Sequence, residues 1–346
     1  MITPHDVDGL VWTAAQLQQV SPSRALPDPD LAAHLDTIGV QAVGPGARYA
    51  KCRSYWLHDD RHRRLLTFGI ERTPDALREL ADRVLARCLG APDEPPTTPL
   101  DLDLEAATVG LERCPVFAAV PWWVEQQGLV FAVQALVRSF DFTNQAGISG
   151  YSDTIGDWLV QTRDRAWQRP EYADTAWRFL RACLAVADDA TCTAARDVAE
   201  GLRRTAALPA QAGLAFAFHE QAWADDVVDA VMPIVAPRAK QKHHTPFLAR
   251  LVGVAGTDAA IRLLGCNNDA LKEGDLLTAL AHHRHAAVSV IAAAWAHAAN
   301  NDQRLQAARA LLPVRTAEAT TLLTTWATEK KVVAPVLKKH LALLAR

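Results

Sequence analysis

The run His282-His283-Arg284-His285 is the densest group of side chains in the chain that could do chemistry. On a helix His282 and His285 would share one face, with Asp275 two turns before them, and a metal ion could use these three ligands. A polar turn between two helices accounts for the same residues, and it is the interpretation that we favour. We therefore expect neither a metal ion nor another cofactor.

The catalytic motifs that begin in this sequence remain incomplete. His219 and Glu220 open like the H-E-x-x-H motif of zinc proteases, but Trp223 stands where the second histidine is needed. Residues 147–152 lack the G-x-S-x-G register of a serine hydrolase, and the chain has no phosphate loop and no dinucleotide-binding glycine motif. We therefore predict that the protein has no catalytic residues and is not an enzyme.

Two groups of side chains point to binding instead. The acidic group surrounds a tryptophan and consists of Glu220, Trp223, Asp225, Asp226 and Asp229. An acidic surface with one large aromatic ring is typical of a contact hot spot for a basic protein. The basic group consists of Arg238, Lys240, Lys242, Arg304 and Arg309. It would suit phosphate groups, so the two groups predict different partners.

Charge is distributed unevenly along the chain. Residues 1–237 contain 21 Lys and Arg against 32 Asp and Glu, a balance of −11. Residues 238–346 contain 15 against 7, a balance of +8, and they also hold seven of the twelve histidines. Such polarity constrains the choice of partner more than it constrains the fold.

Helical spacing of apolar residues dominates the sequence and predicts an all-α fold of roughly fifteen helices. The clearest helices run from Thr73 to Leu89 and from Pro115 towards Phe140, and others begin near Pro170, Asp189, Leu208, Gly256 and Ala286. In residues 49–70 a small β-hairpin competes with two short helices. The proline-rich residues 91–99 predict a linker between a mainly helical cap at 1–90 and a larger helical domain at 100–346.

Short motifs recur in the larger domain at spacings that suit helix pairs of about 40 residues. Asp302, Arg304, Ala307, Ala308 and Leu311 resemble the second-helix signature of HEAT and armadillo repeats, and Asp189, Ala194, Ala195 and Val198 match it less closely. Residues 128–140 are similar to the helical regions of MolR-like proteins. The resemblance implies an α-α superhelix, a HEAT-like solenoid, in which small alanines let neighbouring helices approach closely.

The resemblance and the incomplete catalytic motifs together predict a non-enzymatic protein that binds a macromolecule. The first hypothesis is a bacterial immunity or inhibitor-type protein whose acidic group sequesters a basic protein, such as a toxin or a secreted effector. The alternative is a nucleic-acid-binding HEAT-like protein or DNA glycosylase that uses the basic group together with Trp295 and Trp326.

Sorting signals are missing from the sequence. The first residues lack the basic and then apolar pattern of a signal peptide, and no uncharged apolar run is long enough to cross a membrane. The six cysteines form no C-x-x-C pair, which is typical of reduced thiols. We expect a cytoplasmic protein that makes no membrane contact.

Overall fold

The computed structural model describes residues 6–7, 10–21, 79–80, 83, 101–103, 105–106, 116–143, 160–161, 170–236, 246–266 and 271–345. Within these ranges the chain is mostly helical, which confirms the all-α prediction, and its named strands are four two-residue segments. The hairpin expected at 49–70 and the linker expected at 91–99 lie outside the described residues, as does most of the helix expected from Thr73 to Leu89. No helix in the described ranges is long and apolar enough to cross a membrane.

The chain divides into two compact units, and the first consists of two separate segments of the sequence. Unit 1 comprises Met1–Thr37 and Ala215–Arg346, and unit 2 comprises Ile38–Leu214. The described helices of unit 2 are α7 (Val116–Ser139), α8 (Pro170–Val186) and α9 (Asp189–Arg203), and α10 (Leu208–Phe218) contains the boundary. Those of unit 1 are α1 (Ala14–Leu17), α11 (Gln221–Val235), α12 (Pro246–Leu251), α13 (Thr257–Leu264), α14 (Glu273–His283), α15 (Ala287–Ala296), α16 (Asn301–Ala310), α17 (Ala317–Glu329) and α18 (Ala334–Leu344), with the 3-10 turns η3 (Arg284–Ala286) and η4 (Lys331–Val333).

The strands form two small antiparallel pairs. In unit 1 β1 (Asp6–Val7) pairs with β2 (Leu10–Val11), and in unit 2 β3 (Phe142–Thr143) pairs with β4 (Val160–Gln161). Helices therefore carry the core of both units.

Helix starts lie where the sequence predicts them in α8, α9 and α10. Asp188 closes the N-terminus of α9, because its carboxylate accepts the backbone N–H and the hydroxyl of Thr191, both at 2.8 Å. These hydrogen bonds lower the pKa of Asp188. The same capping chemistry recurs at α16, where Asn300 accepts the backbone N–H of Gln303.

The core of unit 2 forms where α7 packs on α8 and α9. Trp123 of α7 is fully buried and donates its indole N–H to the buried carboxylate of Glu105 at 2.7 Å. Phe140, directly after α7, stacks on Trp177 of α8 with ring centroids 6.2 Å apart. Trp123, Phe140 and Trp177 thus fill the core of unit 2 rather than line a surface.

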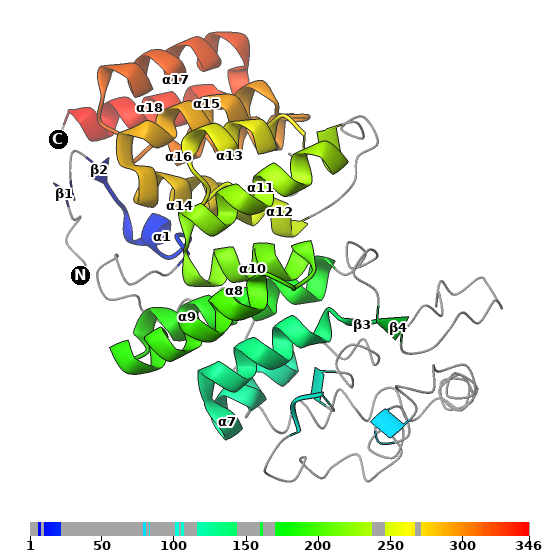
Figure 1. The fold of residues 1–346 in the computed structure, drawn as a ribbon. Helices are drawn as coiled ribbons and strands as arrows, with labels where there is room; N and C mark the ends of the chain where they lie inside the picture. The colour runs from blue at the N-terminus through cyan, green and yellow to red at the C-terminus, as the bar shows by residue number, and fades with distance from the viewer. Residues whose placement is uncertain are drawn as a thin grey trace, which may run out of the picture. The chain divides into compact units, whose positions relative to one another are not determined.

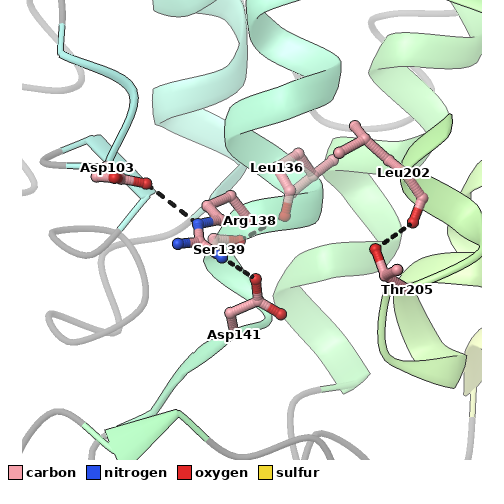
Figure 2. Close-up of polar contacts among 7 residues, drawn as sticks. All are labelled: Asp103, Leu136, Arg138, Ser139, Asp141, Leu202 and Thr205. Carbon is pink, nitrogen blue, oxygen red and sulfur yellow. Dashed lines mark hydrogen bonds and ion pairs between the residues drawn. The ribbon is translucent and has the colours of Figure 1, made fainter. Parts of the chain in front are cut away.

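Polar side chains close the C-terminal ends of α7 and α9 (Figure 2). Arg138 donates to the carboxylates of Asp103, at 3.1 Å, and Asp141, at 2.7 Å. The hydroxyl of Ser139 donates to the carbonyl of Leu136 at 2.7 Å. After α9, the Thr205 hydroxyl donates to the carbonyl of Leu202. Both hydroxyls donate to carbonyls in the last turn of a helix.

In unit 1 each helix from α11 to α18 packs on a neighbour one or two places along the chain (Figure 1). Helix α11 contacts α13, α13 contacts α15, α14 contacts α15 and α16, and α17 contacts α18. Trp295 of α15 and Trp326 of α17 stack almost parallel, with centroids 4.4 Å apart, and both are buried. Ala307 and Ala308, which the repeat-like motif places at a helix contact, are fully buried.

Residues 10–21 contribute buried side chains to the core of unit 1. Leu10 is fully buried and forms a β-bridge with Val314. The backbone N–H of Ser21 donates to the hydroxyl of Thr278 on α14 at 3.0 Å. Gly274 allows this contact, because a Cβ there would lie 2.7 Å from the carbonyl oxygen of Gln19.

Gly213→Ala tests the packing of unit 2. An ideal Cβ at this position would lie 2.0 Å from Cε2 of Trp177, so we expect the free energy of unfolding to fall by about 1–3 kcal/mol. The matched control is Gly201→Ala on α9, where a Cβ meets nothing within 4 Å and the stability should rise by up to about 1 kcal/mol. Urea unfolding followed by far-UV circular dichroism measures both, and equal stabilities of the two variants would contradict the packing.

Candidate functional site

Trp223 does not lie on the acidic surface on which the sequence prediction places it. Its side chain is only 5% exposed and contacts the ring of Phe218, with centroids 5.8 Å apart. The residues four and eight positions later, Val227 and Val231, are buried on the same side of α11. This apolar stripe is the sequence signal that could have assigned Trp223 to the core.

Two of the predicted acidic residues join α11 to α13. Asp225 accepts the backbone N–H of Gly256, directly before α13, at 2.8 Å. One turn later on α11, Asp229 forms an ion pair with Arg262 of α13 at 2.7 Å. The Asp229 side chain is 66% exposed, so this pair contributes at most about 1 kcal/mol and leaves its carboxylate open to solvent.

Asp226 and Glu220 complete the acidic part of the predicted group. Asp226 is exposed on α11, and Glu220 is half-buried directly before the helix starts. Asp226 and Asp229 are three residues apart and therefore lie on one side of the helix. Asp226 and Asp229 thus share an exposed side of α11, whereas Trp223 is buried on another.

One peptide group, between Ala255 and Gly256, is held at both ends. Its N–H donates to Asp225 of α11, and its carbonyl accepts from Nε2 of His283 of α14 at 2.7 Å. Because a carbonyl only accepts, Nε2 of His283 must carry a proton. A Cβ at Gly256 would lie 2.9 Å from the side-chain nitrogen of Gln221, so glycine provides the room for this arrangement. The peptide therefore links α11 to α14.

Three histidine rings lie in a row beside this peptide. The ring centroids of His219 and His282 are 4.3 Å apart, and those of His282 and His283 are 4.4 Å apart. His219, after α10, and Arg284, after α14, both have φ of 56° and are the only non-glycine residues with positive φ in the described ranges. Backbone strain of this kind often marks functional sites. His219 and His282 are far apart in sequence, and no local pattern could have shown that they meet.

Asp275 contacts Arg250 and the start of α14 rather than pairing with His282 and His285 as a metal ligand. Its buried carboxylate forms an ion pair with Arg250 of α12 at 2.5 Å and accepts the backbone N–H of Lys272 at 2.9 Å. His285, the other ligand considered with it, is exposed. Among the described residues, no three His, Cys, Asp or Glu side chains are arranged to hold a metal ion.

The basic group is described only in part. Arg304 is half-buried and donates to the carbonyl of Ala298 at 3.2 Å, whereas Arg309 is exposed on α16. Arg238, Lys240 and Lys242 lie outside the described residues. Trp295 and Trp326, which the nucleic-acid alternative requires as stacking platforms, are stacked on each other and buried.

Asp225 and Asp226 differ in role although they are adjacent. Asp225→Ala removes the acceptor for the Gly256 N–H, and we expect the free energy of unfolding to fall by about 1–3 kcal/mol. Asp226→Ala changes an exposed position and should stay within about 0.5 kcal/mol of the wild type. Equal losses in chemical unfolding would show that Asp225 does not hold the peptide.

Acid should weaken unit 1 through His283. Burial lowers the pKa of this ring below its usual 6.5, although the bond to Ala255 and the charge of Asp225 act in the opposite direction. The unfolded chain therefore binds a proton at this ring more readily than the folded chain does. The contribution of neutral His283 to the free energy of unfolding is fully present above about pH 6.5 and decreases as the pH falls below that value.

The variant that checks this is His283→Gln, which can still donate to Ala255 but does not titrate. We expect its Tm to fall less than that of the wild type between about pH 7 and about pH 5. His285→Gln, at an exposed position two residues away, serves as the control and should follow the wild type. A wild-type-like fall in His283→Gln would contradict the assignment.

Comparison of the chain with protein-family models, with curated proteins and with solved structures finds no match.

Proposed function

We propose that the protein is a non-enzymatic helical-repeat protein that binds a basic protein partner through the exposed carboxylates of α11. The acidic surface is defined here by Asp226 and Asp229, with Glu220 at its edge. Asp225 does not belong to this surface, because its carboxylate accepts the backbone N–H of Gly256 and so holds α11 against the start of α13. The partner would be a toxin or effector of basic charge, and the protein its inhibitor.

The packing of unit 1 supports a repeat scaffold. Helices α11, α13 and α15 contact one another in series, and α14 contacts α16, so several helices meet the helix two places along the chain. Stacked helix pairs of HEAT type are built from such contacts. A scaffold of this kind holds α11 by one face and leaves the opposite face to solvent.

The observation that carries the proposal is the division of α11 into two faces. Trp223, Val227, Val228 and Val231 are buried, whereas Asp226, Asp229 and Ala230 are exposed. The carboxylates on the open face attract a basic partner and raise its association rate. Because Trp223 is buried, a partner would meet carboxylates and short apolar side chains rather than an aromatic anchor.

A pull-down from an extract of the cells that encode the protein tests this proposal. The wild type should retain a basic protein at one-to-one stoichiometry, and D226K/D229N should bind it about tenfold more weakly or less. The matched control is E318K/E329Q on α17, which changes the net charge equally at two exposed positions and should bind as the wild type does.

Two outcomes would count against the proposal. Equal binding by wild type and D226K/D229N would place the contact elsewhere on the molecule. Retention of duplex DNA, lost at high salt and unaffected by D226K/D229N, would favour the nucleic-acid alternative.

A further inference from the structure

Helix α18 exposes a surface that is both basic and apolar. Leu341 is 47% exposed and Leu344 is 39% exposed, and Lys338 is exposed one turn before Leu341. Spacings of three residues place these side chains along one side of the helix. We define the α18 surface as Lys338, Leu341 and Leu344. No Asp or Glu occurs from Lys330 to Arg346, so an acidic partner would meet no repulsion there.

Helix α11 exposes a surface that also combines charged and apolar side chains, but its charge is negative. Ile234 is 39% exposed, and Asp226, Asp229 and Ala230 are exposed at spacings that place all four on one side of α11. We define the α11 surface as these four residues. Each surface thus combines charge with at least one large apolar side chain, which a soluble protein exposes less often than lysine or aspartate.

The two surfaces cannot meet within one molecule. Both helices belong to unit 1, and Figure 1 shows α13, α15 and α16 between them. The packing of α11 on α13 and of α17 on α18 fixes the two helices in separate parts of that unit. A second molecule can supply the complementary charge.

We propose that the α18 surface of one molecule docks on the α11 surface of a second copy, so that the molecules associate head to tail. Lys338 would face Asp226 and Asp229, and Leu341 and Leu344 would cover Ile234 and Ala230. This inference rests on the proposed binding role of α11 and names another copy as a partner. A contact between two different surfaces leaves one of each free at the ends, so further copies can add.

The composition of the α18 surface favours a protein partner over nucleic acid. Phosphates would pair with Lys338 but would leave Leu341 and Leu344 uncovered. The helix is about 16 Å long, which limits the buried area to the range of weak, transient contacts. We expect dissociation constants on the order of 100 µM, stronger at low salt because the charges are exposed.

Sedimentation velocity of the full chain tests the inference, with two variants that each reverse one surface. D226K/D229N reverses the α11 surface, and K338E/K339Q reverses the charge of α18. The wild type should form species that grow with concentration and shrink with salt, whereas each variant alone should remain monomeric. An equimolar mixture should associate again, because the intact α18 surface of the first variant can dock on the intact α11 surface of the second.

Controls separate this contact from other causes. E318K/E329Q should associate as the wild type does, and L341S/L344S should remain monomeric although its charge is unchanged. Circular dichroism establishes that each variant is folded. Continued association of either single-surface variant, or no dimer in the mixture, would overturn the proposal.

Failure of this inference and failure of the proposed function are distinguishable. A wild type that is monomeric at every concentration overturns head-to-tail docking, whereas the proposed function fails only if no basic protein depends on Asp226 and Asp229. Binding to anionic vesicles through Lys338 and Leu341, with no self-association, would likewise overturn docking and assign α18 to a membrane surface.

Discussion

The buried ion pair between Arg250 and Asp275 is the contact on which unit 1 depends most. It joins α12 to the first turn of α14, and the same carboxylate accepts the backbone N–H of Lys272, where α14 begins. Loss of either partner would leave a buried charge uncompensated, at a cost of about 3–5 kcal/mol. Through α14 the pair also positions Thr278, which holds Ser21, and His283, which holds the Ala255–Gly256 peptide.

This arrangement gives the short α12–α13 pair a central place between α11 and α14. Arg250 and the carbonyl of Ala255 face α14, whereas Gly256 and Arg262 face α11. The acidic residues of α11 are therefore not equivalent. Asp225 holds the Gly256 N–H, Asp226 is exposed, and Asp229 pairs with Arg262 while its carboxylate stays exposed. Stability and binding can accordingly be changed separately on one helix.

Local chemistry made much of the fold predictable. Helix α8 begins at Pro170, α9 follows the cap Asp188, and α10 has Pro209 as its second residue. The alanine pair Ala307-Ala308 is buried as the repeat-like spacing requires. The site was less predictable. Trp223 lies between Glu220 and Asp225 in the sequence, which suggested an exposed position. Its burial follows only when Val227 and Val231, on the same side of α11, are considered with it. In sequence, Asp275 lies two helical turns before the histidines, and this spacing suggested a shared metal site. Its actual partner, Arg250, comes from another helix, and no local pattern encodes such a pair.

The contact between residues 10–21 and the last helices has a consequence for the order of folding. Ser21 and Thr278 are 257 residues apart, and all of unit 2 is synthesised between them. A ribosome makes the chain from its N-terminal side onward, so Leu10 must wait for Val314, and Ser21 for Thr278, before these contacts can form. Closing so long a loop costs little more entropy than closing one half its length, about 0.6 kcal/mol, but the search is slow. Unit 1 can thus be completed only after all of unit 2 has been synthesised.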